Sequence, residues 1–404
     1  MAKKIKTNPR QLMDDFVMHG TDAFECAEAT RRLVDATSVY NEAGPRFEWY
    51  VLTTNGTADI IKHCPYNVIT QGTGRYILLD ALRKKGSPAS EWPEELWDEA
   101  ITKDRIFICF VDNNGEQKLM PVTERIGSDF AGIGITGSAA QRASYHLLGL
   151  VAEQTMDKNI TIVTRKEPCK SGYIEKVITM RSDSYAYIPQ DEALALATEV
   201  CKDGDMVEWH LDNFFTEVLY QFPKSAVSTT YGRKKGDFMP YIRYTTSDAG
   251  DSSCAFELGW EINGRTVFLA SGANRVFRTH RGTWNQGMRD SLYMDAIKLK
   301  DKFIILADRM KELDSIIVLN ENIERVVRHL CSDAKITGKA IQDAFVNYVT
   351  NEFGNTDATA AEIVLSVIEA QDKDQVLNDL SDIQKRALKN KLGEVPYQRI
   401  RQKI

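Results

Sequence analysis

Residues 240–289 read PYIRYTTSDAGDSSCAFELGWEINGRTVFLASGANRVFRTHRGTWNQGMR. Three runs in this segment are rich in β-branched and aromatic residues, and turn residues separate them: YIRYTT (241–246), CAFELGW (254–260) and TVFLA (266–270). Asn263-Gly264 is typical of a tight hairpin turn, because both residues tolerate a positive φ. A helical pattern then continues to residue 317. The segment predicts a β-β-β-α unit over residues 240–314, in which an arginine-bearing loop leads from the third strand into a long helix.

Patterns of both kinds occur outside this unit, so we expect an α+β fold, with antiparallel hairpins in a mixed body. Residues 1–45 are expected to form a mainly helical N-terminal segment, which ends at Gly44-Pro45 because proline cannot continue a helix. The body, residues 46–318, contains further predicted strands at 47–54, 105–111, 159–166 and 173–182 and predicted helices at 139–156 and 191–200.

Residues 319–404 are expected to form a helical C-terminal region with a basic tail. Amphipathic patterns predict helices at 321–330, 338–353 and 358–370. Thr359 and Glu362 match a capping box, in which each side chain accepts a hydrogen bond from the other residue's backbone N–H. The shift from strands to continuous helical periodicity places the boundary near residue 318.

Composition narrows the class of protein. The chain has 404 residues and is 43% hydrophobic, enough to bury a sizeable core. Its seven cysteines form no C-x-x-C pair and have no histidine at ligand spacing, which argues against disulfides, zinc or another metal. No apolar run is long enough for a membrane span or a signal peptide. We expect a cytoplasmic protein without a cofactor.

The arginine segment, residues 265–289, contains five arginines and no acidic residue, although the chain has a formal net charge of −6. Guanidinium groups bind phosphate through two parallel hydrogen bonds, and aromatic rings between them provide stacking surfaces for bases. These features predict a site for single-stranded nucleic acid, with the residues Arg265, Arg275, Phe277, Arg278, His280, Arg281, Trp284 and Arg289. A structural interpretation stays open, in which the aromatic rings are core, the arginines pair with acids of the helical region, and His280 is a solvated loop residue.

A second candidate site is the run Gly132–Gly137, which matches the G-x-G-x-x-G pattern of dinucleotide-binding loops. The segment before it is a poor buried strand, and Glu167 lies thirty residues after the last glycine, where about twenty is usual. We therefore expect a structural turn. Asp248 and Asp251 are interpreted as hairpin-loop residues rather than metal ligands, because Asp, Gly and Ser are dense there.

Two stretches also follow the pattern of a known family. Residues 161–200 contain a strand ending in arginine, then a strand that runs into Ser-Asp-x-Tyr and a helix, and residues 240–275 contain a Ser-x-x-Gly hairpin. Together they resemble a phage- and plasmid-borne family of unknown function. The matching positions are Arg165, Ser182, Tyr185, Ser247 and Gly250.

The resemblance covers roughly residues 130–290 and rests on short motifs. The third strand departs from the family, which has a Cys-x-Asn-Gly turn where this chain has Ala270–Asn274. The resemblance implies an origin in a mobile element and a cytoplasmic protein, without an assigned activity or catalytic residues.

Three functions stay open at this point. The first is binding of single-stranded DNA in recombination, annealing or replication, because the β-β-β-α order is similar to the core of phage single-strand annealing proteins. The second is an inhibitor or adaptor that binds a host protein, which the overall acidity favours. The third is a nucleotide-dependent enzyme that uses Gly132–Gly137. A homo-oligomer is compatible with all three.

Overall fold

The structure is a computed structural model that describes residues 17–43, 48–51, 106–112, 114–121, 158–169, 172–212, 214–249, 252–268, 274–333, 336 and 338–370. Helices and antiparallel sheets both occur in these ranges, and the C-terminal part is helical, which confirms the α+β prediction. The Gly132–Gly137 run lies outside the described residues.

An eight-stranded sheet forms the centre of the fold. Its strands are β1 (Val17–Gly20), β8 (Asp205–Asp212), β9 (Thr216–Gln221), β10 (Val227–Tyr231), β11 (Lys234–Thr246), β12 (Cys254–Ile262), β13 (Arg265–Phe268) and β14 (Arg275–Arg278). They are ordered β1-β8-β9-β11-β12-β13, while β10 pairs with β11 and β14 pairs with β12. Every pairing is antiparallel. The predicted turn is confirmed, since Asn263 and Gly264 have φ values of 51° and 79°.

The predicted β-β-β-α unit needs two corrections. The expected loop contains a fourth strand, β14, because residues 275–278 pair with the first half of β12. The expected long helix is broken into α8 (Gln286–Ile297), the short 3-10 helix η6 (Lys300–Lys302) and α9 (Ile305–Asp314). The indole N–H of Trp260 donates to the carbonyl of Phe303 at 3.1 Å. That carbonyl would accept from the N–H of Ala307 in a continuous helix.

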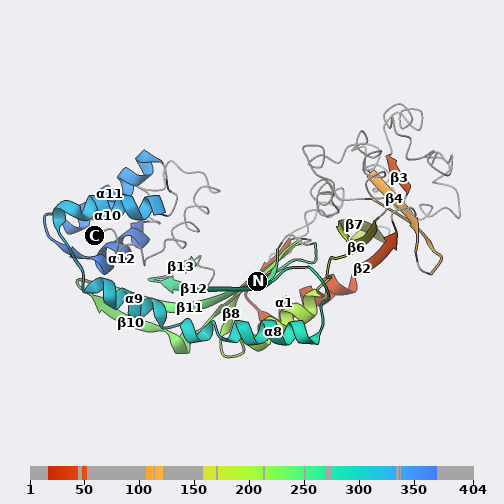
Figure 1. Cartoon of the computed structure of the whole chain (residues 1–404), viewed down its shortest axis with the longest axis horizontal. Coiled ribbons are helices and arrows are strands. Elements are labelled where there is room, and N and C mark those ends of the chain that lie inside the picture. The colour runs from red at the N-terminus through yellow and green to blue at the C-terminus, as the bar shows by residue number, and fades with distance from the viewer. Residues whose placement is uncertain are drawn as a thin grey trace.

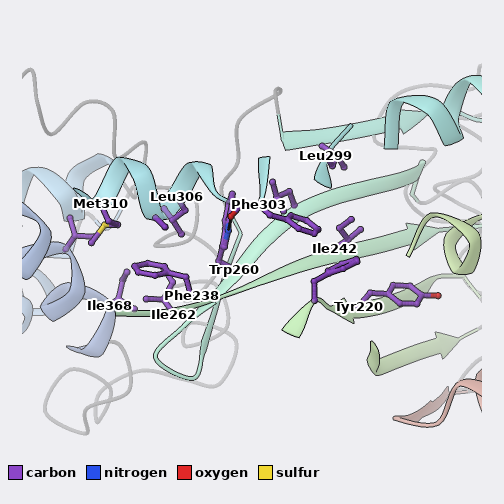
Figure 2. Packing of buried hydrophobic residues seen from close by; sticks show 14 of the residues in the cluster. Tyr220, Phe238, Ile242, Trp260, Ile262, Leu299, Phe303, Leu306, Met310 and Ile368 are labelled. Atoms are coloured by element: carbon purple, nitrogen blue, oxygen red, sulfur yellow. Dashed lines mark hydrogen bonds between the residues drawn. The ribbon is translucent and has the colours of Figure 1, made fainter. Parts of the chain in front are cut away.

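The main core lies between one face of this sheet and a layer of helices, which includes α1 (Ala23–Asp35), α7 (Gln190–Val200), α8 and α9. Alternation along the strands decides the face. Ile242, Tyr244 and Phe256 are buried beneath the helices, whereas their neighbours Arg243 and Glu257 lie on the opposite face. In Figure 2, Leu306 and Met310 of α9 lie over Phe238 and Ile262, while Ile242 lies on the other side of Trp260, near Phe303.

Two smaller sheets have three strands each. One has the order β2 (Thr37–Ala43), β6 (Asn159–Cys169) and β7 (Gly172–Ser182), and the other β3 (Glu48–Val51), β4 (Ile106–Val111) and β5 (Gln117–Pro121). The strands predicted in these regions are confirmed. The N-terminal helix is shorter than expected and ends at Asp35, because Thr37–Ala43 pairs with β6 along its whole length. This run contains β-branched and aromatic residues, which fit a strand better than a helix.

The C-terminal region contains β15 (Ile317–Val318), α10 (Asn320–Asp333), α11 (Lys339–Phe353), β16 (Ala358–Thr359) and α12 (Ala360–Ala370). The capping box is confirmed, with Thr359 N–H 2.7 Å from Glu362 Oε2 and Glu362 N–H 3.1 Å from Thr359 Oγ1. Glu362 also accepts from Arg233, in the turn between β10 and β11. Lys234 is 2.6 Å from Glu352 and 2.7 Å from Glu369. The prediction that residues 319–404 form a separate C-terminal region stays a prediction.

These parts form an elongated arrangement (Figure 1). The eight-stranded sheet occupies the middle, the helices α10, α11 and α12 lie at one end, and the two three-stranded sheets lie at the other. Among the helices that the structure describes, none is both long and apolar enough to cross a membrane.

Candidate nucleic-acid interface

The arginine segment lies partly on β14 and partly in the turn that leads to α8. The register of β14 places Arg275 opposite Glu257 and Phe277 opposite Ala255. Both side chains therefore belong to the sheet face that faces away from the helices. Arg278 belongs to the other face, because it is opposite Cys254 of the main core.

Two of the arginines are neutralised by acids of the helices, as the structural interpretation proposed. Arg278 is 3.1 Å from Asp295 Oδ2 and 2.8 Å from Ser291 Oγ, both on α8. Hydrogen bonds from Lys298 and Arg278 lower the pKa of Asp295. Arg289 is 3.5 Å from Glu199 at the end of α7.

Arg275 and Arg281 are exposed and form no ion pair within the described ranges. The guanidinium of Arg275 lies 5.2 Å from the centroid of the Phe277 ring, a distance typical of a cation–π contact. The side chain of Phe277 is 46% exposed. Glu257, which lies opposite Arg275 in the sheet, accepts from Arg243, with Nε at 3.1 Å.

His280 and Trp284 do not have the exposed side chains that we expected for contact with a nucleic acid. His280 is buried, with Nδ1 3.1 Å from the carbonyl of Ala186 and Nε2 2.9 Å from the carbonyl of Ser252. Burial lowers the pKa of His280. Both expectations for it, a nucleic-acid contact and a solvated loop residue, are corrected. Trp284 packs against the core and donates its indole N–H to Glu192 at 2.9 Å. Of Arg265 the structure describes only the backbone.

Three of the five motif residues, Arg165, Tyr185 and Ser247, meet at one short loop, which we call the Asp248 loop (residues 247–249). Arg165 forms a buried ion pair with Asp248 at 2.5 Å, and the hydroxyl of Tyr185 donates to the carbonyl of Asp248 at 2.6 Å. Ser247 is buried and donates to the carbonyl of Phe214. Ser182 lies at the end of β7, where its hydroxyl is 2.8 Å from that of Ser184.

Gly250 of the motif lies outside the described residues. Asp248 is the residue that the sequence interpretation missed. No local sequence signal marks it, because its partner Arg165 is 83 positions away.

Within the part of the chain that the structure describes, no three His, Cys, Asp or Glu side chains are placed to hold a metal ion. Comparisons with protein-family models, curated proteins and solved structures found no match. The resemblance to a phage- and plasmid-borne family stays a prediction.

Proposed function

We propose that the protein binds single-stranded nucleic acid at a surface formed by Arg275, Phe277 and Arg281. One observation carries the proposal: 5.2 Å from the centroid of an exposed aromatic ring lies a guanidinium that has no ion-pair partner among the described residues. A base can stack on such a ring while the arginine contacts the adjacent phosphate. The proposal keeps the expected phage or plasmid role in DNA metabolism, without catalysis.

The charges around this surface limit its size. Glu217, Glu257 and Glu261 line the same sheet face, and carboxylates there disfavour a phosphate backbone. The bound strand therefore follows the β14 edge and contacts few nucleotides. Two phosphate contacts give a log-affinity against log-salt slope of about −1.4 for a single strand.

The test is fluorescence anisotropy with a labelled single-stranded DNA of twenty thymidines at several salt concentrations. We expect the triple variant Arg275→Ala/Phe277→Ala/Arg281→Ala to bind at least tenfold more weakly, because one stacked base contributes about 1–3 kcal/mol. The matched control is Arg278→Ala/Arg289→Ala, which removes two arginines that already pair with acids. Equal affinity of the triple variant and the parent, or no binding by the parent, would refute the proposal.

A second candidate is an adaptor that binds a protein through the same sheet face. The acidic residues of that face favour it, because Glu217, Glu257 and Glu261 accompany a single arginine of β11, Arg243, which already pairs with Glu217 and Glu257. A basic partner segment would suit this surface. A parent that fails to bind single-stranded DNA at low salt would favour this candidate.

A further inference from the structure

Most of the buried apolar side chains of the described residues fall into two groups. The main core runs from α1 through the eight-stranded sheet to α12. A second group lies on strands β4 to β7 and is not part of that core: Ile108, Phe110, Met120, Ile160, Ile162, Val163, Val177, Ile178 and Met180. Two parts of a protein that have separate apolar cores can move relative to one another without exposing either core.

Hydrogen bonds and an ion pair connect β6 and β7 to the Asp248 loop. Thr179 and Arg181 of β7 donate to the carbonyl of Ala249, with distances of 3.2 Å from Thr179 Oγ1 and 3.0 Å from Arg181 Nε. Arg165 of β6 pairs with Asp248, whose carbonyl also accepts from Tyr185. We call this set of contacts the latch.

The Arg165–Asp248 ion pair is buried, and its net contribution to the stability of the closed latch is small. The two side chains are 2% and 1% exposed, and Asp248 Oδ1 has no hydrogen-bond partner in the described structure. Removing two charges from water offsets most of their attraction, so such a pair contributes little net stability, although loss of one partner is strongly destabilising. When the latch opens, both charges regain hydration. The pair therefore opposes opening by less than the direct attraction between its charges.

The arginine segment crosses this latch. Ala186 N–H donates to the carbonyl of His280 at 3.2 Å, and Gly282 N–H donates to the carbonyl of Ser184 at 3.0 Å. The rings of Tyr185 and His280 are stacked with centroids 5.2 Å apart. Tyr185 and Arg281 also form an isolated β-bridge. Arg281 is thus fixed to the chain that leaves β7, whereas Arg275 and Phe277 are fixed to β12.

We infer that the β2–β6–β7 sheet and the eight-stranded sheet can move relative to one another about a hinge, and that the latch contacts hold the two sheets in the closed arrangement. A nucleic-acid strand bound across Arg275, Phe277 and Arg281 stabilises this closed arrangement. The described chain crosses the hinge at Ala36, between α1 and β2, and at residues 183–189, between β7 and α7. The second half of this inference rests on the proposed function, whereas the first half does not.

The hinge is tested by a distance measurement in solution. Spin labels on Tyr173→Cys and Ile304→Cys, which are 72% and 56% exposed in the parent, report the separation of the two parts. We expect a single narrow distance in the parent chain and an added, different distance in Asp248→Asn. The control Asp295→Asn also removes one carboxylate charge from an ion pair with arginine, but outside the latch, and it leaves the distance unchanged. A narrow, parent-like distribution in Asp248→Asn overturns the hinge.

A second variant protects the test against simple misfolding. Arg165→Met/Asp248→Asn removes both charges of the pair, so it leaves no buried ion and is expected to fold while still showing the added distance. Circular dichroism and gel filtration check the fold. If the double variant is folded and shows only the parent distance, the latch contacts do not hold the two sheets closed.

The coupling is tested by adding the single-stranded DNA of twenty thymidines to Asp248→Asn. We expect the added distance to disappear, and the dissociation constant to exceed that of the parent by the inverse of the closed fraction, about twofold when half of the molecules are open. The same three substitutions, Arg275→Ala, Phe277→Ala and Arg281→Ala, combined with Asp248→Asn prevent this closure. DNA that binds without changing the distance distribution overturns the coupling alone. A parent that binds no DNA overturns the proposed function and the coupling, but not the hinge.

Discussion

Replacement of Glu362 by glutamine tests how the C-terminal helices are attached to the central sheet. Glu362 is 2% exposed. Its carboxylate accepts from the backbone N–H of Thr359 and Arg233, both at 2.7 Å, and from Nε of Arg233 at 2.9 Å. It therefore caps α12 and links that helix to the β10–β11 turn. Glutamine has nearly the same shape but lacks the charge.

The expected effect follows from these three hydrogen bonds. A hydrogen bond to a charged group contributes about 1.5–3 kcal/mol, against about 0.5–1.5 kcal/mol for a neutral one. The loss of charge at Glu362 therefore lowers the free energy of unfolding by about 3 kcal/mol at pH 7. Urea unfolding followed by circular dichroism measures this difference. The control Glu324→Gln breaks an exposed pair with Arg328 and changes stability by less than about 1 kcal/mol.

The pH dependence gives an independent check. Hydrogen bonds from Arg233 and from backbone N–H groups outweigh the effect of burial and lower the pKa of Glu362 below its ordinary value of 4.5. The stabilisation is therefore complete above that ordinary value and is lost as the pH falls through the lower pKa of the folded state. The difference between the parent and Glu362→Gln should be constant from neutral pH to about pH 5.5 and should shrink in more acidic solution. A difference below about 0.5 kcal/mol at pH 7 would refute the reasoning.

Three further changes test the packing. Gly232→Ala should lower the free energy of unfolding more than Gly264→Ala: both glycines have positive φ, but a Cβ at Gly232 would lie 2.5 Å from the Glu362 carboxyl carbon, and at Gly264 nothing lies within 4 Å. Equal effects in urea unfolding would contradict this. Trp260→Phe removes the hydrogen bond at the α8–α9 break and should lower the free energy of unfolding by about 1 kcal/mol; an unchanged urea midpoint would count against it. Burial raises the pKa of Cys254 to about 12, so iodoacetamide at pH 8 should modify this thiol only after unfolding, as mass spectrometry would show; rapid modification of the folded protein would count against burial.

The parts of the fold that the sequence predicted are those with a strong local signal. Residues 241–246 and 254–260 read as strands bounded by turn residues, and Asn263-Gly264 adopts the positive φ that its sequence predicts. Strand β14 has no such signal, because its sequence RVFR has few apolar residues and its pairing with β12 is a distant contact. The helix break at Phe303 also depends on a distant donor, Trp260.

The candidate site shows the same difference between features with a local sequence signal and features that depend on distant residues. Charge counting located the arginine segment, but the acids that neutralise Arg278 and Arg289 lie on separate helices, so the sequence did not separate these residues from Arg275 and Arg281. Asp248 looked like an ordinary turn residue because its partner, Arg165, is 83 positions away. Only the folded structure brings the two together.

The link between Arg233 and Glu362 also affects how the chain folds during synthesis. The two residues are 129 positions apart, which corresponds to roughly 6–26 s of translation at about 5–20 residues per second. During that interval the β10–β11 hairpin exists without α12, and Phe238, which lies near Ile368 in the finished core, lacks that cover (Figure 2). The nascent chain therefore exposes an apolar hairpin for many seconds, so we expect chaperone binding to be strongest in this window.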